Sequence, residues 1–166
     1  TQCLGIEKIL TKIITHIEAL EKARSYCAYQ ERCHQEIEKK LRSFQLNRDE
    51  MDYVILLLMQ GNYLNEERFA RSFVSGKYRI KKWGRNKIVM KLKEKAVSKK
   101  CIELGLQEID TSEYYGNLYH IAERRLEASK ETNPFKKKQK VATYLYGRGY
   151  ESNLIWEVID ELINAE

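Results

Sequence analysis

The sequence predicts an all-α protein made of three tandem three-helix repeats that form an elongated, curved helical array. Three observations support the prediction: the composition, an apolar pattern that occurs three times, and helix-capping residues near the expected helix ends. One proline and eight glycines among 166 residues are too few for the many tight turns of an all-β fold. A chain of this length can also bury a hydrophobic core without disulfides or a metal ion.

The apolar pattern recurs at intervals of 51 and 53 residues, without gaps inside the copies. Six aligned positions are apolar in all three copies: Ile37, Ile88 and Val141; Leu41, Leu92 and Leu145; Leu46, Val97 and Tyr150; Met51, Ile102 and Ile155; Ile55, Leu106 and Ile159; Leu58, Ile109 and Leu162. Their spacing is a step of four, a break, and then steps of four and three, which are helix periods on either side of a turn. Each copy therefore contains two helices whose apolar faces need a neighbouring copy for full burial.

A further helix fits before each pair, over residues 20–28, 69–78 and 114–128. The predicted organisation is an N-terminal extension, residues 1–17, followed by three-helix repeats over 18–61, 62–110 and 111–166. Leu4, Ile9, Ile13 and Ile17 fit one face of a helix, but the β-branched run at residues 13–15 disfavours helix. The form of the extension is therefore left open.

Capping residues agree with these boundaries. Asn47 with Glu50, and Asp110 with Glu113, have the spacing of a capping box, in which the first side chain binds a free amide and the acid binds back. Asn133 precedes Pro134, a favourable first residue of a helix. Gly61 and the pair Gly147 and Gly149 are expected to end helices.

The cysteines and the apolar segments bear on location. Cys3, Cys27, Cys33 and Cys101 show no paired spacing and lie within helical patterns, so we expect reduced thiols. The apolar segments are too short to cross a bilayer, and no pattern resembles a signal peptide. The sequence predicts a cytoplasmic protein that does not bind a membrane.

No residue pattern indicates an enzyme. Cys27, Cys33 and His34 do not have the spacing of a zinc site, and buried thiols are the simpler interpretation. His16 and His120 are isolated in helical stretches and lack carboxylates nearby in sequence. The glycines of YGRGY, residues 146–150, follow no strand and belong to no phosphate-binding motif. We therefore predict no catalytic residue, no metal and no cofactor.

Charge is distributed unevenly along the chain. The net charge is +6, but residues 77–100 hold eleven Lys or Arg and one acid, whereas residues 151–166 hold five acids and no base. Two basic runs occupy equivalent positions of the second and third repeats, the first around Gly84 where one helix ends and the next begins. They are Lys77, Arg79, Lys81, Lys82, Arg85, Lys87 and Lys91; and Lys136, Lys137, Lys138 and Lys140. Because like charges repel, such runs favour a binding function over a passive surface. Trp83, among these bases, is expected to be partly buried.

Residues 62–97, NYLNEERFARSFVSGKYRIKKWGRNKIVMKLKEKAV, resemble the most recognisable stretch of the RecX family of recombination regulators. RSYCAYQERCHQEIEKKL resembles the first two helices of the family, and VATYLYGRGYESNLIWEVI its closing repeat. The resemblance covers about residues 18–165. The isoleucine-rich first fifteen residues and the pair Trp83 and Gly84 depart from many relatives.

The resemblance implies three three-helix repeats and binding to RecA filaments on single-stranded DNA. Such a protein inhibits the ATPase, strand exchange and coprotease activities of RecA, and so regulates DNA repair, recombination and the SOS response. We expect a monomer that uses the two basic runs to contact RecA or DNA. The alternatives are a helical-repeat protein that binds single-stranded or duplex DNA directly, and a protein scaffold that binds neither DNA nor RecA.

Overall fold

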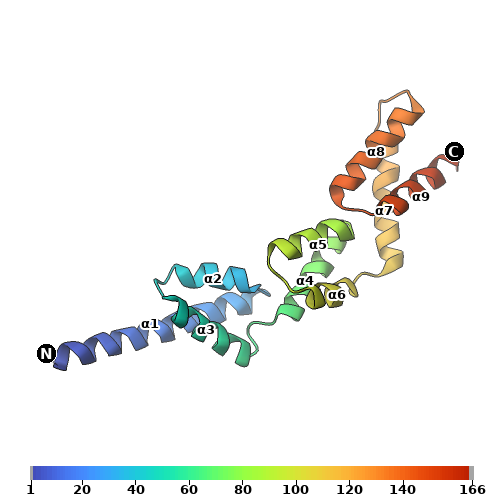
Figure 1. Cartoon of the computed structure of the whole chain (residues 1–166). Helices are drawn as coiled ribbons and strands as arrows, with labels where there is room; N and C mark the ends of the chain where they lie inside the picture. The colour runs from blue at the N-terminus through green and yellow to red at the C-terminus, as the bar shows by residue number, and fades with distance from the viewer. Residues whose placement is uncertain (1, 165–166) are drawn as a thin grey trace. The chain divides into compact units, whose positions relative to one another are not determined.

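The predicted all-α, three-helix repeats are present in the structure (Figure 1). The computed structural model describes the backbone of residues 2–164 and the side chains of residues 16–164. Within this range there are nine helices and no strand: α1 (Gln2–Tyr29), α2 (His34–Arg42), α3 (Arg48–Gln60), α4 (Glu66–Arg79), α5 (Arg85–Glu94), α6 (Lys99–Leu106), α7 (Thr111–Glu127), α8 (Pro134–Arg148) and α9 (Ser152–Asn164). The fold class is therefore confirmed.

The aligned apolar positions form the core. Of the eighteen side chains, all are buried except Leu106 and Leu162, which are partly buried. The repeat also extends to the backbone, because the residue before the third aligned position has a left-handed conformation in every copy. These residues are Gln45 (φ 57°), Ala96 (φ 55°) and Gly149 (φ 89°). The three copies thus make the same turn after their second helix.

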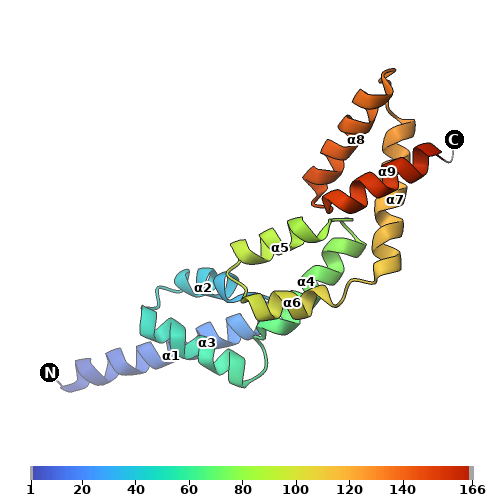
Figure 2. The same cartoon turned by 45° about the vertical axis from the view of Figure 1, so that its right-hand side comes forward.

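The helices group into two compact units. The first contains the chain up to Phe69 together with Lys95–Ser98, and the second contains Ala70–Glu94 and the chain from Lys99 onwards. The division falls within α4, so it does not follow the repeats. In the first unit α1, α2 and α3 contact one another, and in the second α7, α8 and α9 do so, as both views show (Figures 1 and 2).

Residues 2–17, whose form the sequence left open, belong to the same helix as the first predicted helix of repeat one. Their β-branched run does not interrupt α1. From residue 19 on, α1 buries Ala19, Ala23 and Cys27 against the first unit's core. The expected buried thiols are confirmed: Cys27 and Cys33 are free and buried, and burial raises the pKa of both. Cys3 lies outside the described side chains.

The predicted caps are largely confirmed. Asn47 and Glu50 form the capping box at the start of α3, with backbone-to-side-chain distances of 2.8 and 3.0 Å. Asp110 accepts from the amide of Glu113, but the Glu113 carboxylate accepts from Tyr78 and Arg79 rather than from the Asp110 amide, so this capping box is only half formed. Asn133 accepts from the amide of Lys136. Gly61 and Gly149 end α3 and α8. The prediction for Gly147 was wrong, because this glycine lies inside α8, two residues before the left-handed residue that stops the helix.

None of the helices in the described part of the chain has the length and hydrophobicity of a membrane-spanning segment.

Candidate functional site

The turn between α4 and α5 carries several of the predicted bases, and α8 holds it in place. Lys82 has a left-handed backbone (φ 52°), which is unfavourable for a residue other than glycine. Its carbonyl oxygen accepts hydrogen bonds from Arg148 Nη2 at 3.0 Å and from the Tyr150 hydroxyl at 3.1 Å. Arg148 also donates to the carbonyl of Lys81. These hydrogen bonds hold the turn in place although a lysine, and not a glycine, has the left-handed conformation.

Because of two glycines, the backbone at the start of α5 contacts the backbone at the end of α8 directly. The amide of Gly84 donates to the carbonyl of Arg148 at 2.9 Å, and the amide of Asn86 donates to that of Gly149 at 3.0 Å. A Cβ atom on Gly84 would lie 2.1 Å from the carbonyl carbon of Gly149. Only glycine fits this contact, so the basic turn of repeat two is joined to the end of a repeat-three helix.

Two of the predicted bases lie next to the ring of Trp83. This tryptophan is partly buried, as predicted. The ammonium groups of Lys77 and Lys87 lie 5.2 and 4.9 Å from the centre of its ring, within the range of cation–π attraction. The Lys87 ammonium also donates to the carbonyl of Gly147. Lys81 is exposed and follows the same turn.

Three other bases of the first run have acidic partners within the second unit. Arg79 lies 3.3 Å from Glu113, and Lys91 lies 2.7 Å from Glu94. Arg85 lies 2.9 Å from Glu151, and its guanidinium stands over the ring of Tyr114 at 4.1 Å. Part of the positive charge expected from the sequence is therefore neutralised internally.

The second basic run likewise contains both lysines with acidic partners and lysines without them. Lys138 lies 2.9 Å from Asp160, and Lys140 lies 2.6 Å from Glu131, where its hydrogen bond lowers the pKa of the Glu131 carboxyl. Lys136 and Lys137 have no acid within 4 Å among the described residues. This run opens α8, and a rise of about 1.5 Å per residue puts it about 18 Å along the helix from Arg148.

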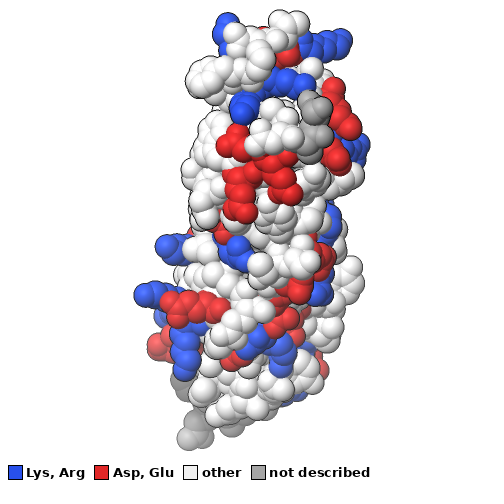
Figure 3. All heavy atoms as spheres, turned by 90° about the vertical axis from the view of Figure 1, so that its right-hand side faces the viewer, with Lys and Arg blue, Asp and Glu red and all other residues white. Residues whose placement is uncertain are grey.

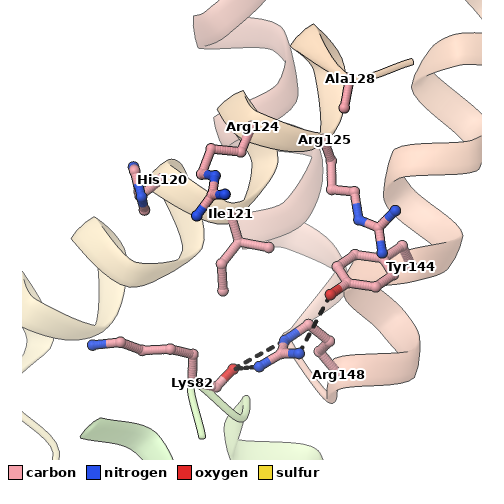
Figure 4. Close-up of a pocket in the computed structure, with 8 residues that line it drawn as sticks. All are labelled: Lys82, His120, Ile121, Arg124, Arg125, Ala128, Tyr144 and Arg148. Atoms are coloured by element: carbon pink, nitrogen blue, oxygen red, sulfur yellow. Dashed lines mark hydrogen bonds between the residues drawn. The ribbon is translucent and has the colours of Figure 1, made fainter. Parts of the chain in front are cut away.

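A basic pocket lies where α7, α8 and the Lys82 turn meet (Figure 4). Its volume is about 610 Å³, and we call it the Tyr144 pocket. The lining residues are Lys82, His120, Ile121, Arg124, Arg125, Ala128, Tyr144 and Arg148. None of them is acidic, so the pocket concentrates positive charge.

Two arginines flank Tyr144 within this pocket. The guanidinium of Arg125 lies 3.6 Å from the centre of the tyrosine ring, and Arg148 Nη1 donates to the hydroxyl at 3.4 Å. Figure 4 shows Arg125 pointing toward the ring and Arg148 held between Tyr144 and the carbonyl of Lys82. Hydrogen bonding from Arg125, reinforced by Arg148, lowers the pKa of the Tyr144 hydroxyl against the opposing effect of burial. The pocket therefore has a positive potential.

Acidic side chains gather elsewhere in the second unit. On the face shown in Figure 3, Asp and Glu side chains lie next to one another close to the C-terminal helix. The acids of α9 are Glu157, Asp160 and Glu161, and Glu161 accepts a hydrogen bond from the Tyr115 hydroxyl. The uneven charge of the sequence is thus an uneven surface charge in this unit.

Comparison with known proteins identifies the family. The model of the second three-helix domain of RecX matches residues 65–106, and that of the third matches residues 112–159. "Regulatory protein RecX" of Prosthecochloris aestuarii is 30% identical over 152 residues, which cover 88% of this chain and 94% of that protein. The chain belongs to the RecX family.

Other RecX proteins are similar in sequence and fold. The regulatory protein RecX of Clostridioides difficile is 25% identical over 91% of this chain and 71% of its own length. The crystal structure of RecX from Lactobacillus salivarius superposes with a TM-score of 0.81 at 23% identity, covering 90% of this chain and 97% of that one. That structural likeness supports the helical fold.

Most of the Tyr144 pocket was missed by the sequence reasoning. Only Lys82 was predicted, because Arg124, Arg125 and Arg148 belong to short, mixed stretches rather than to a basic run. His120 was wrongly described as lacking a carboxylate nearby, since Glu123 lies 3.7 Å from it. One usable signal was the spacing of Lys140, Tyr144 and Arg148, which places them on one face of a helix.

Proposed function

We propose that this protein binds RecA filaments on single-stranded DNA and inhibits the ATPase, strand exchange and coprotease activities of RecA. Membership of the RecX family supports a regulatory role, and the resemblance on which the family was first inferred implies RecA as the partner. On this proposal the protein acts by binding rather than by catalysis, as a cytoplasmic monomer with repeats over residues 18–61, 62–110 and 111–166.

The observation that carries the proposal is the unneutralised positive charge in the second unit. Lys77 and Lys87 surround Trp83, and the Tyr144 pocket adds a group of bases without an acid among its lining residues. A filament on single-stranded DNA encloses a dense row of phosphates. Basic groups bind such phosphates with release of counterions, which makes the affinity fall steeply with salt.

The test is the RecA ATPase on single-stranded DNA, titrated with this protein at low and moderate salt. Wild type should inhibit the ATPase, and the variant Lys77→Gln, Lys81→Gln, Lys87→Gln should need about tenfold more protein for half inhibition. The matched control is Lys22→Gln, Lys39→Gln, Lys100→Gln, which removes three exposed charges outside the predicted runs. Equal inhibition by the two variants would contradict the assignment of these bases. Lack of inhibition by wild type would contradict the proposed function itself.

A further inference from the structure

We propose that the Tyr144 pocket binds the phosphodiester and the base of one nucleotide of single-stranded nucleic acid. This inference rests on the proposed function, because it names the part of the same basic surface that contacts the DNA. Arg124 and Arg125 hold the phosphate, and the Tyr144 ring offers a stacking surface for the base.

The charges of the pocket indicate an anionic ligand. Arg124 and Arg125 are exposed, and neither has an acid within 4 Å in the described part of the chain. Lys82 and Arg148 are brought to the same pocket by hydrogen bonds that fix the backbone of the turn. Four like charges line the pocket with no acid among the lining residues, so they repel one another, and a bound anion lowers that repulsion.

The aromatic ring beside the arginines favours a nucleotide phosphate over a carboxylate side chain. A guanidinium is planar and donates two parallel hydrogen bonds, which suit a phosphodiester and a carboxylate alike, so the ring makes the distinction. Arg125 already stacks on Tyr144 at 3.6 Å, so a flat π-system can extend this stack. The side chains of aspartate and glutamate supply charge but no aromatic ring. A volume of about 610 Å³ is also within the usual range for a site that holds one small organic ligand.

A single strand fits the pocket better than a duplex. In a duplex the bases are paired and stacked inside, so a recessed tyrosine cannot reach them, whereas the bases of a single strand are free to stack on aromatic side chains. One face of α8 extends the proposed binding surface for the strand beyond the pocket, since Lys137, Tyr144 and Arg148 recur at helical spacing. This face is about 16 Å long at 1.5 Å per residue, which is enough for a few nucleotides.

The experiment is RecA-free binding of a short fluorescein-labelled oligodeoxythymidylate, followed by fluorescence anisotropy at several salt concentrations. The variant Arg124→Gln, Arg125→Gln should bind about 10- to 100-fold more weakly, with a shallower salt dependence. The matched control Lys39→Gln, Lys100→Gln removes two exposed charges and should stay within about threefold of wild type. Tyr144→Leu should lower affinity about tenfold, and Tyr144→Phe should keep most of it, because the ring remains.

Two competitors separate the possible ligands. A glutamate-rich peptide of equal charge should displace the labelled strand poorly, and a duplex of equal length should compete less well than unlabelled single strand. Oligonucleotide binding that Arg124→Gln, Arg125→Gln and Tyr144→Leu both leave unchanged would overturn the proposal, as would stronger competition by the acidic peptide. Circular dichroism checks that each variant is folded. If wild type binds the oligonucleotide through this pocket but leaves RecA ATPase unaffected, the proposed function fails while the pocket assignment stands.

Discussion

Ala96 and Gln45 hold a left-handed backbone at the position where the third repeat has Gly149. A side chain with a Cβ atom is strained in this conformation, at a cost of about 1–2 kcal/mol. Ala96→Gly should therefore raise the free energy of unfolding by about 0.5–1 kcal/mol, after the greater entropy of glycine in the unfolded chain is taken into account. Equilibrium unfolding in urea measures the change.

The reverse substitution tests the same reasoning. Gly149→Ala adds a Cβ atom 2.3 Å from that of Lys87, so it should destabilise the protein by about 2 kcal/mol or more. Gly116→Ala is the matched control, because nothing lies within 4 Å of the added carbon inside α7, and alanine there should stabilise the helix slightly. A destabilising Ala96→Gly would show that strain at this turn is unimportant.

The burial of Tyr150 makes the stability of the protein depend on pH, and it also determines the direction of that dependence. Burial raises its pKa to about 12, whereas the unfolded side chain titrates at 10.0. Between these values the unfolded chain has lost a proton that the folded chain keeps, so stability falls as pH rises. The contribution of this tyrosine to the free energy of unfolding is complete below pH 10. Above pH 10 it decreases by about 1.4 kcal/mol per pH unit.

Tyr150→Phe removes this dependence. Urea unfolding at pH 9, 10 and 11 should show wild type losing stability above pH 10 faster than the variant, by roughly 1 kcal/mol per pH unit. At neutral pH the variant should be less stable by about 1 kcal/mol, because the Tyr150 hydroxyl no longer donates to the carbonyl of Lys82. Parallel pH profiles of the two proteins would show that another group controls alkaline unfolding.

At the scale of elements, the close packing of α5 on the end of α8 depends on Gly84. Gly84→Ala puts a carbon 2.2 Å from both the carbonyl oxygen of Gly149 and the amide of Tyr150. Since both neighbours are backbone atoms, the helices must separate, with the loss of the 2.9 Å bond from Gly84 to Arg148. We expect a loss of about 3 kcal/mol in urea unfolding.

Hydrogen exchange locates the effect of Gly84→Ala. The amides at the start of α5 and the end of α8 should exchange faster, while those of α2 and α3 in the first unit should keep their protection. Gly76→Ala serves as the control in α4, because no atom lies within 4 Å of its added carbon. Unchanged exchange around Gly149 would mean that the glycine contact does not hold these two helices together.

The helices were largely predictable because each repeat carries its own local signals. Period, caps and spacing were all present in the sequence, and sixteen of the eighteen aligned apolar residues are buried. The form of α1 was not predictable, since the β-branched run at residues 13–15 disfavours helix locally although the helix continues through it. Gly147 was misjudged because its neighbour Gly149 supplies the left-handed stop.

At the scale of the whole molecule, the basic runs could be predicted but their neutralisation could not. A run of charge is visible in a sequence, whereas Arg85 and Glu151 are 66 residues apart and meet only through folding. Arg148 is a comparable case: its role in holding Lys82 depends on the contact between two repeats. The same reason explains why the Tyr144 pocket was missed.

The ion pairs divide the eleven predicted bases into two groups with different expected roles. Arg79, Arg85, Lys91, Lys138 and Lys140 have acidic partners and contribute to the fold. The bases with no acid within 4 Å among the described residues are Lys77, Lys81, Lys82, Lys87, Lys136 and Lys137, so their charge is available to a partner. Stability and binding should therefore respond to different substitutions.

Arg85→Gln should lower the free energy of unfolding by about 1–2 kcal/mol, because the Glu151 carboxylate, only 24% exposed, loses its positively charged partner and keeps only the hydrogen bond from Tyr114 among the described residues. Lys77→Gln, Lys81→Gln should change stability by less than about 0.5 kcal/mol but weaken inhibition of RecA, most clearly at low salt. Urea unfolding and ATPase titration at two salt concentrations measure both responses. If Lys77→Gln, Lys81→Gln destabilised the protein as much as Arg85→Gln, the unpaired lysines would be part of the fold, and the positive charge they carry would not be reserved for binding.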